Sequence, residues 1–70
     1  MRSLKPKELI RILQDKGFYV SQQKGSHVGL RSYLNPKFKI IVPLHNKDIK
    51  PGTLSSILRQ AGISKEEIKN

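Results

Sequence analysis

A chain of 70 residues without cysteine has neither a disulfide framework nor a thiolate metal site, and its two histidines without clustered carboxylates argue against a zinc centre. A domain of this length buries only about 60% of the surface that its unfolded chain exposes, so a site must be shallow or completed by a partner. Fourteen Lys and Arg against five Asp and Glu give a net charge of +9, which favours a polyanionic partner such as nucleic acid over a merely soluble basic surface.

The first part of the chain predicts a helix and then a strand. Pro6 suits the first turn of a helix, where its missing N–H costs nothing, and an amphipathic pattern continues over residues 7–16 until Gly17 ends it. The apolar side of this helix holds Leu9, Ile10 and Leu13. Residues 18–23 are aromatic and β-branched at first and then polar, which predicts a strand. Its inward residues are expected to be Phe18 and Val20.

A turn over residues 24–26 leads directly into a second, antiparallel strand over residues 27–32. The turn is built on Gly25 and Ser26, and it fixes where the strand starts, so His27 takes a defined place and orientation. Because strand residues alternate between faces, the inward residues are expected to be Val28 and Leu30, and the open face is expected to hold His27, Gly29 and Arg31. A glycine at this position leaves a gap where a ligand or another backbone can approach closely.

A third strand follows the turn at Asn35-Pro36, and residues 38–42 give the strongest strand signal in the chain. The inward set is expected to be Phe38, Ile40 and Val42. Two further residues are expected to share the open face with His27 and Arg31, namely Lys39 and Ile41. Pro43 stops this strand, and the loop over residues 44–50 carries His45, Lys47 and Lys50.

The last part of the chain predicts a second helix and a short helical turn. Pro51 opens the helix with Thr53 close behind, and Gly62 ends it in the αL conformation. The residues that can face the sheet are Leu54, Ile57, Leu58 and Ala61. Ser64 and Glu67 have the spacing of a capping box, which predicts a last helical turn that holds down Ile63 and Ile68.

The order helix, three strands, helix predicts an α+β domain, α-β-β-β-α, with a three-stranded antiparallel sheet and helices on one face. We expect a single domain over residues 1–70, without an internal repeat or a linker. The sequence shows neither a secretory signal nor a membrane span, so we expect a cytoplasmic protein. Function is expected on the face of the sheet that the helices leave open.

Two histidines are candidates for chemistry. Imidazole can both take and give a proton near neutral pH, which makes His27 the first candidate, although a lone histidine in a small protein is usually a surface or core residue. His45 is a candidate second participant, although a loop histidine more often makes a local hydrogen bond. Residues 47–53 place lysines just before a helix start, where free N–H groups suit phosphate, yet ordinary helix initiation explains Pro51 and Thr53 equally well.

Three segments together resemble a known family. They are Gly25-Ser26-His27, the strand end Ile41-Val42-Pro43 with His45 after it, and residues 47–54 with residues 56–63. Over residues 6–63 the chain resembles the HicA (YcfA-like) toxin family. The resemblance implies a double-stranded-RNA-binding-domain-like fold, cleavage of mRNA without a metal or other cofactor, and neutralisation by a HicB-type antitoxin. It also implies that the strand histidine, here His27, carries the chemistry.

One departure from the family is visible, since many members have an aromatic residue where this chain has Leu30. Because Leu30 is expected to face inward, the difference should affect packing more than catalysis. We expect RNA cleavage by attack of a ribose 2′-hydroxyl on the adjacent phosphate, with His27 as base or acid. The candidates for phosphate binding are Lys24, Arg31, Lys39, Lys47 and Lys50. Two other interpretations stay open: a non-catalytic RNA-binding module of the same fold, and a small adaptor that binds an acidic protein surface.

Overall fold

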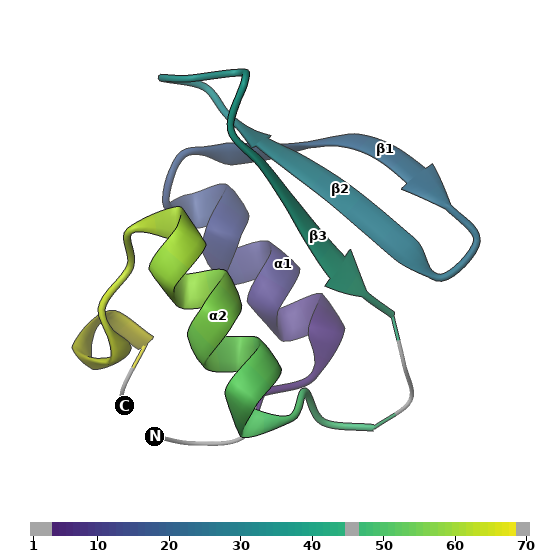
Figure 1. Ribbon diagram of the computed structural model, residues 1–70, viewed down its shortest axis with the longest axis vertical. Coiled ribbons are helices and arrows are strands. Elements are labelled where there is room, and N and C mark those ends of the chain that lie inside the picture. The colour runs from purple at the N-terminus through teal and green to yellow at the C-terminus, as the bar shows by residue number, and fades with distance from the viewer. Residues whose placement is uncertain (1–3, 45–46, 69–70) are drawn as a thin grey trace.

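The computed structural model describes residues 4–44 and 47–68 and has the expected order of elements. The helices are α1 (Pro6–Asp15), α2 (Pro51–Ala61) and the short 3-10 helix η1 (Lys65–Ile68). The strands are β1 (Phe18–Lys24), β2 (His27–Ser32) and β3 (Lys39–Pro43), which form one antiparallel sheet in the order β1-β2-β3. Both α-helices cover the same side of this sheet (Figure 1). The predicted α+β fold is therefore confirmed.

A single apolar core lies between the sheet and the two α-helices. On the sheet side, Val28 and Leu30 of β2 and two residues of β3 are buried, as their alternation predicts. The helices contribute Leu9, Leu13, Leu54, Ile57 and Leu58. Two loop residues that the sequence patterns did not single out, Leu4 and Ile49, are buried as well, and the Ile49 N–H donates to the Leu4 carbonyl at 2.8 Å. This contact fixes the chain just before each α-helix.

Val20 faces the helix side as predicted, but neither Val20 nor Phe38 is buried in the core. Val20 pairs with Leu30 and so points to the helix side, but β1 is an edge strand and Val20 stays 41% exposed. Phe38 precedes β3 and is 39% exposed; its N–H donates to the Asn35 carbonyl at 2.9 Å, so it belongs to the turn. Strand alternation therefore predicts burial only for a residue that lies within the hydrogen-bonded ladder and has other side chains packed on both sides of it.

A β-bulge in β1 decides which of its side chains share a face with His27. The pairing passes from Val20 opposite Leu30 to Gln22 opposite Gly29, so Ser21 is an extra residue, and its hydroxyl donates to the Gly29 carbonyl at 3.2 Å. Regular alternation from Phe18 and Val20 would put Lys24 on the helix side. The extra residue reverses the alternation, and Lys24 pairs directly with His27.

The C-terminal turn is fastened to the end of α1. Gly62 ends α2 with φ of 72°, as expected, and the Ser64 N–H donates to Glu67 Oε2 at 2.8 Å, which is one half of the predicted capping box. Lys16 Nζ lies 2.9 Å from Glu67 Oε1. Both contacts favour the carboxylate, so the pKa of Glu67 lies below its ordinary value of 4.5, chiefly through the Lys16 hydrogen bond.

This shift makes the stability contributed by Glu67 depend on pH. A carboxyl group whose pKa is depressed by folding stabilises the protein above its unfolded pKa and loses that contribution as the pH falls through the folded value. We expect Glu67→Gln to lower the melting temperature at about pH 7, and we expect the difference from the parent protein to shrink as the pH falls below the ordinary pKa of 4.5. Glu66→Gln, which removes the same charge from the neighbouring position, is the control. A melting difference for Glu67→Gln that persists in acid would contradict the ion pair as its cause.

Candidate functional site

The side of the sheet that faces away from the helices, called the open face here, consists of three rows of side chains. Residues directly opposite each other in an antiparallel sheet point to the same side, so the register defines the rows. The first row is Lys24, His27 and Pro43. The second row is Gln22, Gly29 and Ile41. The third row is Tyr19, Arg31 and Lys39.

His27 stands at one end of the open face with its side chain exposed. It is the first residue of β2 and directly follows the turn, where Gly25 has φ of 54°. The Leu44 N–H donates to the Ser26 carbonyl, so the chain that leaves β3 is held beside this turn. No described residue makes a hydrogen bond to the His27 imidazole. Within the described part of the chain, neither ring nitrogen is therefore engaged.

The gap expected at Gly29 is filled by side chains of the protein itself. A Cβ atom at Gly29 would lie 3.1 Å from Cγ of Gln22 and 3.2 Å from Cε of Lys39. The aliphatic part of Lys39 thus crosses the sheet over Gly29, although its backbone belongs to the third row. This path carries the Lys39 ammonium group to the middle of the open face, one row from His27. The missing side chain of Gly29 provides the space for it.

Arg31 lies on the same face as His27 but at the other end. The two residues are four positions apart on β2, which corresponds to about 13 Å at the usual rise of a strand. Arg31 Nη1 donates to the Pro36 carbonyl at 2.6 Å and is thereby held by the connection between β2 and β3. The structure does not bring this guanidinium group next to the imidazole.

The remaining candidates belong to the segment between β3 and α2. Lys47 is exposed, and Lys50 is the N-cap residue of α2, also exposed. Neither is part of the three rows of the open face. His45 lies outside the described residues. Of the phosphate-binding candidates, the structure therefore groups Lys24 and Lys39 with His27.

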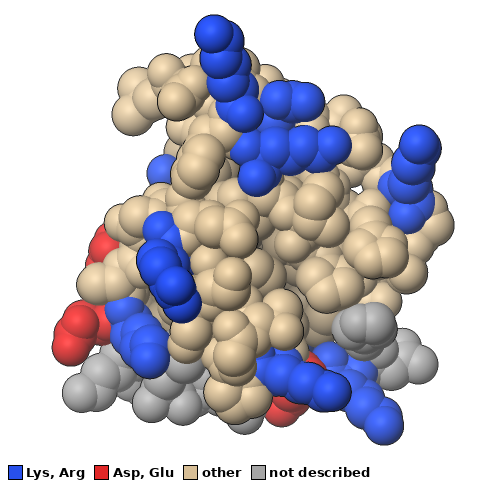
Figure 2. Space-filling model, in the orientation of Figure 1, with Lys and Arg blue, Asp and Glu red and all other residues tan. Residues whose placement is uncertain are grey.

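The sheet carries positive charge without a nearby acidic residue. No Asp or Glu occurs between Asp15 and Asp48, a stretch that contains all three strands and both connections between them. The basic residues of the strands and their connections are Lys24, Arg31, Lys37 and Lys39. In Figure 2 the acidic side chains of the visible face lie in the lower half, and the upper part, over the strands, shows only basic ones. This acid-free stretch is visible in the sequence, and it makes the sheet a candidate surface for an anionic ligand.

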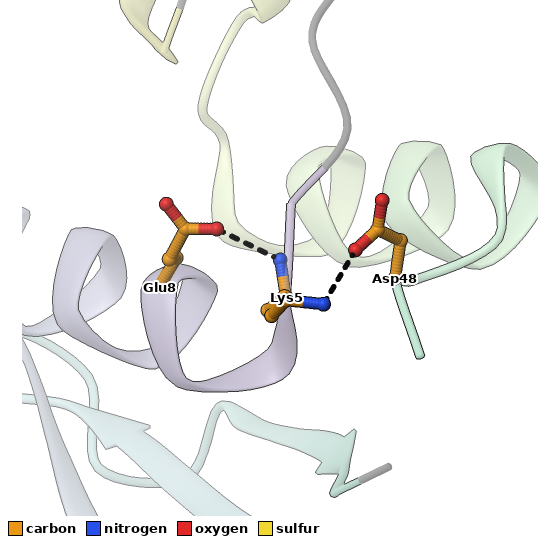
Figure 3. A network of polar contacts seen from close by, with 3 residues as sticks. All are labelled: Lys5, Glu8 and Asp48. Atoms are coloured by element: carbon orange, nitrogen blue, oxygen red, sulfur yellow. Dashed lines mark hydrogen bonds and ion pairs between the residues drawn. The ribbon is translucent and has the colours of Figure 1, made fainter. Parts of the chain in front are cut away.

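Two ion pairs between described residues lie near the ends of the helices. Lys5 Nζ is 3.2 Å from Asp48 Oδ1, and the Lys5 N–H donates to Glu8 Oε1 at 3.1 Å (Figure 3). Lys16 pairs with Glu67, as described above. Three of the five acidic residues therefore make polar contacts around the helix ends, and none of these contacts involves a cation of the open face.

Two aromatic residues of the open face were not among the predicted site residues. Tyr19 belongs to the third row, and Tyr33 is the first residue after β2. The rings of Tyr19 and Tyr33 pack against each other, with their centroids 4.6 Å apart. The sequence contains no other tyrosine. Their spacing along the chain gave no signal of contact, because it is the antiparallel register that places them together.

Comparison with known proteins connects this geometry with a family. Among the described residues, no three His, Cys, Asp or Glu side chains are grouped so that they could hold a metal ion. In the same part of the chain, no helix is long and apolar enough to cross a membrane. Curated proteins yielded no match to the sequence. A family model described as the HicA toxin of bacterial toxin–antitoxin systems matches residues 6–63.

Proposed function

The chain belongs to the HicA toxin family of bacterial toxin–antitoxin systems, and from this premise we propose that it is a metal-independent endoribonuclease that cleaves mRNA and so blocks translation. The observation that carries the proposal is His27, exposed at the end of a basic sheet face whose strands contain no acidic residue. Cleavage of mRNA places this activity in the cytoplasm. The protein partner that we propose is a HicB-type antitoxin.

His27 has the position that a general acid or base needs. Attack of a ribose 2′-oxygen on the adjacent phosphorus forms one O–P bond and breaks the bond to the 5′-oxygen, which leaves a cyclic phosphate and a 5′-hydroxyl. The 2′-hydroxyl must lose a proton, and the leaving 5′-oxygen must gain one. An exposed imidazole that no described residue engages can perform either transfer. One such group contributes a rate factor on the order of 10² to 10⁴, which suits a slow enzyme that only has to stop translation.

Lys24 and Lys39 are the cations that we assign to the reacting phosphate. Lys24 lies directly opposite His27, and Cβ atoms of such a pair are about 4.5–5.5 Å apart. Lys39 extends over Gly29 toward the same row. Charge at these two positions can stabilise the crowded phosphorane in the transition state. The role falls to these lysines because the structure supplies no acidic neighbour to neutralise them on the sheet.

The other candidate residues have more distant roles in this proposal. Arg31, about 13 Å from His27 along β2, and Lys47 and Lys50, before α2, would bind phosphates that flank the cleaved one. His45 is the candidate for the second proton transfer. The alternative function is a non-catalytic RNA-binding module of the same fold, in which the same cations bind phosphates but His27 transfers no proton.

Incubation of the purified protein with a long RNA in the presence of a chelator tests the proposal. We expect cleavage to continue in the chelator, with products that end in a cyclic phosphate, because a histidine and lysines suffice for the reaction. RNA that is bound but stays intact, with or without added divalent ions, would support the binding module instead. Cleavage that stops in the chelator and returns with added metal would reject metal independence.

A further inference from the structure

A pair of tyrosines forms the end of the open face opposite His27. Tyr19 is in the third row, and Tyr33 lies two residues beyond Arg31, so it is the diagonal neighbour of Tyr19 on the same face. Their ring planes are tilted by 42° with centroids 4.6 Å apart. Tyr33 is 69% exposed, and neither ring is part of the apolar core. The exposed ring of Tyr33, packed on the half-buried ring of Tyr19, is therefore an aromatic surface outside the apolar core.

The segment that presents Tyr33 is held in place by hydrogen bonds. The Tyr33 N–H donates to the Gly17 carbonyl at 3.0 Å, and Ser32 Oγ accepts from two backbone N–H groups of the turn that follows. Arg31 Nη1 donates to the Pro36 carbonyl at 2.6 Å. A ligand that binds the exposed ring thus meets a surface that is already ordered, which lowers the entropic cost of binding.

The charge around the pair indicates what it binds. Arg31 shares the third row with Tyr19, Lys37 lies in the adjoining connection, and no acidic residue occurs in the strands or their connections. Aromatic rings beside cations are the features with which proteins bind unpaired nucleotides, since the ring stacks on the base and the cation contacts the phosphate. Bases inside a duplex are stacked on each other and cannot reach such a ring.

We propose that the Tyr19–Tyr33 pair is a stacking platform that binds an unpaired base of the RNA. This inference rests on the proposed function and specifies the substrate of the same face. The third row lies about 13 Å from the His27 row, a distance of no more than about four nucleotides at a stacked rise of about 3.4 Å. The platform thus holds the RNA a few nucleotides away from the phosphate at His27.

Tyrosine fluorescence of a His27→Ala variant gives a direct measurement. The chain has no tryptophan and only these two tyrosines, so its intrinsic emission comes from the platform alone. We expect an unstructured oligouridine to quench this emission as it binds, and an RNA duplex of the same length to quench it far less. Equal quenching by duplex and single strand would overturn the proposal, as would quenching by an antitoxin protein but not by RNA.

Substitutions at two adjacent exposed positions separate stacking from general apolar contact. Tyr33→Leu is expected to weaken binding of the single strand roughly 5- to 150-fold, which corresponds to the loss of one stacked base. Tyr33→Phe is expected to keep most of the affinity, and Leu34→Ala, at a position that is 98% exposed in the same connection, is expected to change nothing. Affinity that is unchanged in Tyr33→Leu, or lost equally in Leu34→Ala, would overturn the platform.

Cleavage assays on variants that retain His27 keep this inference distinct from the proposed nuclease. A protein that never cleaves RNA but shows the quenching and the Tyr33→Leu loss would reject the nuclease and support the platform. If the parent protein and the Tyr33→Leu variant cleave RNA at the same rate and with the same KM, the nuclease would be supported and the platform rejected. We expect Tyr33→Leu to raise KM for single-stranded RNA more than it lowers kcat.

Discussion

His27→Ala is expected to abolish detectable RNA cleavage and growth inhibition while the protein stays folded. Removal of a group that transfers a proton in the transition state lowers the rate by a factor on the order of 10² to 10⁴. The side chain is exposed at the start of β2 and no described residue makes a hydrogen bond to it, so stability should change by no more than about 0.5 kcal/mol. The measurements are the cleavage rate, growth on induction, the far-UV circular dichroism spectrum and the melting temperature.

Gln23→Ala is the matched control for this variant. Gln23 is exposed and lies close to His27 in the same hairpin, but it pairs with Val28 and so points to the helix side of the sheet. We expect this control to cleave RNA at the parent rate. If the His27→Ala protein still cleaves RNA, another residue must transfer the proton, and His45 would be the next residue to replace. A His27→Ala protein that unfolds would make His27 a structural residue.

The second large effect is expected from the antitoxin, which should abolish both cleavage and RNA binding by covering the open face. A basic face without acidic residues is steered toward a negatively charged surface, and occlusion of that face is the simplest way to silence it. A standard interface buries about 800 Å² of each partner, which is about a sixth of the 4863 Å² of accessible surface of this chain. An interface of that size, placed on the open face, would cover His27 and Lys39 together.

Competition for the His27→Ala variant measures this effect. A HicB-type antitoxin encoded beside the gene is expected to displace labelled RNA and to raise the melting temperature, because a partner that binds only the folded state stabilises it by mass action. Lys39→Ala should weaken binding of both RNA and antitoxin. Lys7→Ala, which removes an exposed lysine from α1 on the other side of the molecule, should weaken neither. A ternary complex of toxin, antitoxin and RNA would contradict occlusion of the open face.

Features of the fold that depend on local sequence could be predicted without the structure. The two amphipathic helices, with Leu9 and Leu13 in the first and Leu54 in the second, follow from apolar spacing together with Pro and Gly at their ends. The start of β2 at His27 follows from the turn at Gly25 and Ser26. The family was also identified from contiguous motifs, among them Gly25-Ser26-His27 and residues 47–54, and the family model confirms it.

The details of the candidate site required the tertiary structure. Regular alternation along β1 would put Lys24 on the helix side, and only the extra residue Ser21 brings it opposite His27. The pairing of residues on neighbouring strands also decides that Lys39 passes over Gly29. It decides equally that Tyr19 contacts Tyr33. Strand alternation predicted that Val20 and Phe38 face inward, and their exposure follows from the edge position of β1 and from the turn before β3.

The sequence by itself therefore determined the elements, their order, most of the core and the position of His27 at the start of a strand, since these depend on residues within one or two turns of each other. The tertiary structure decided which cations stand beside His27, which aromatic rings meet and how far Arg31 lies from the imidazole. The physical reason is that a bulge and a register are set by hydrogen bonds between strands, and those bonds are satisfied only when the whole sheet is assembled.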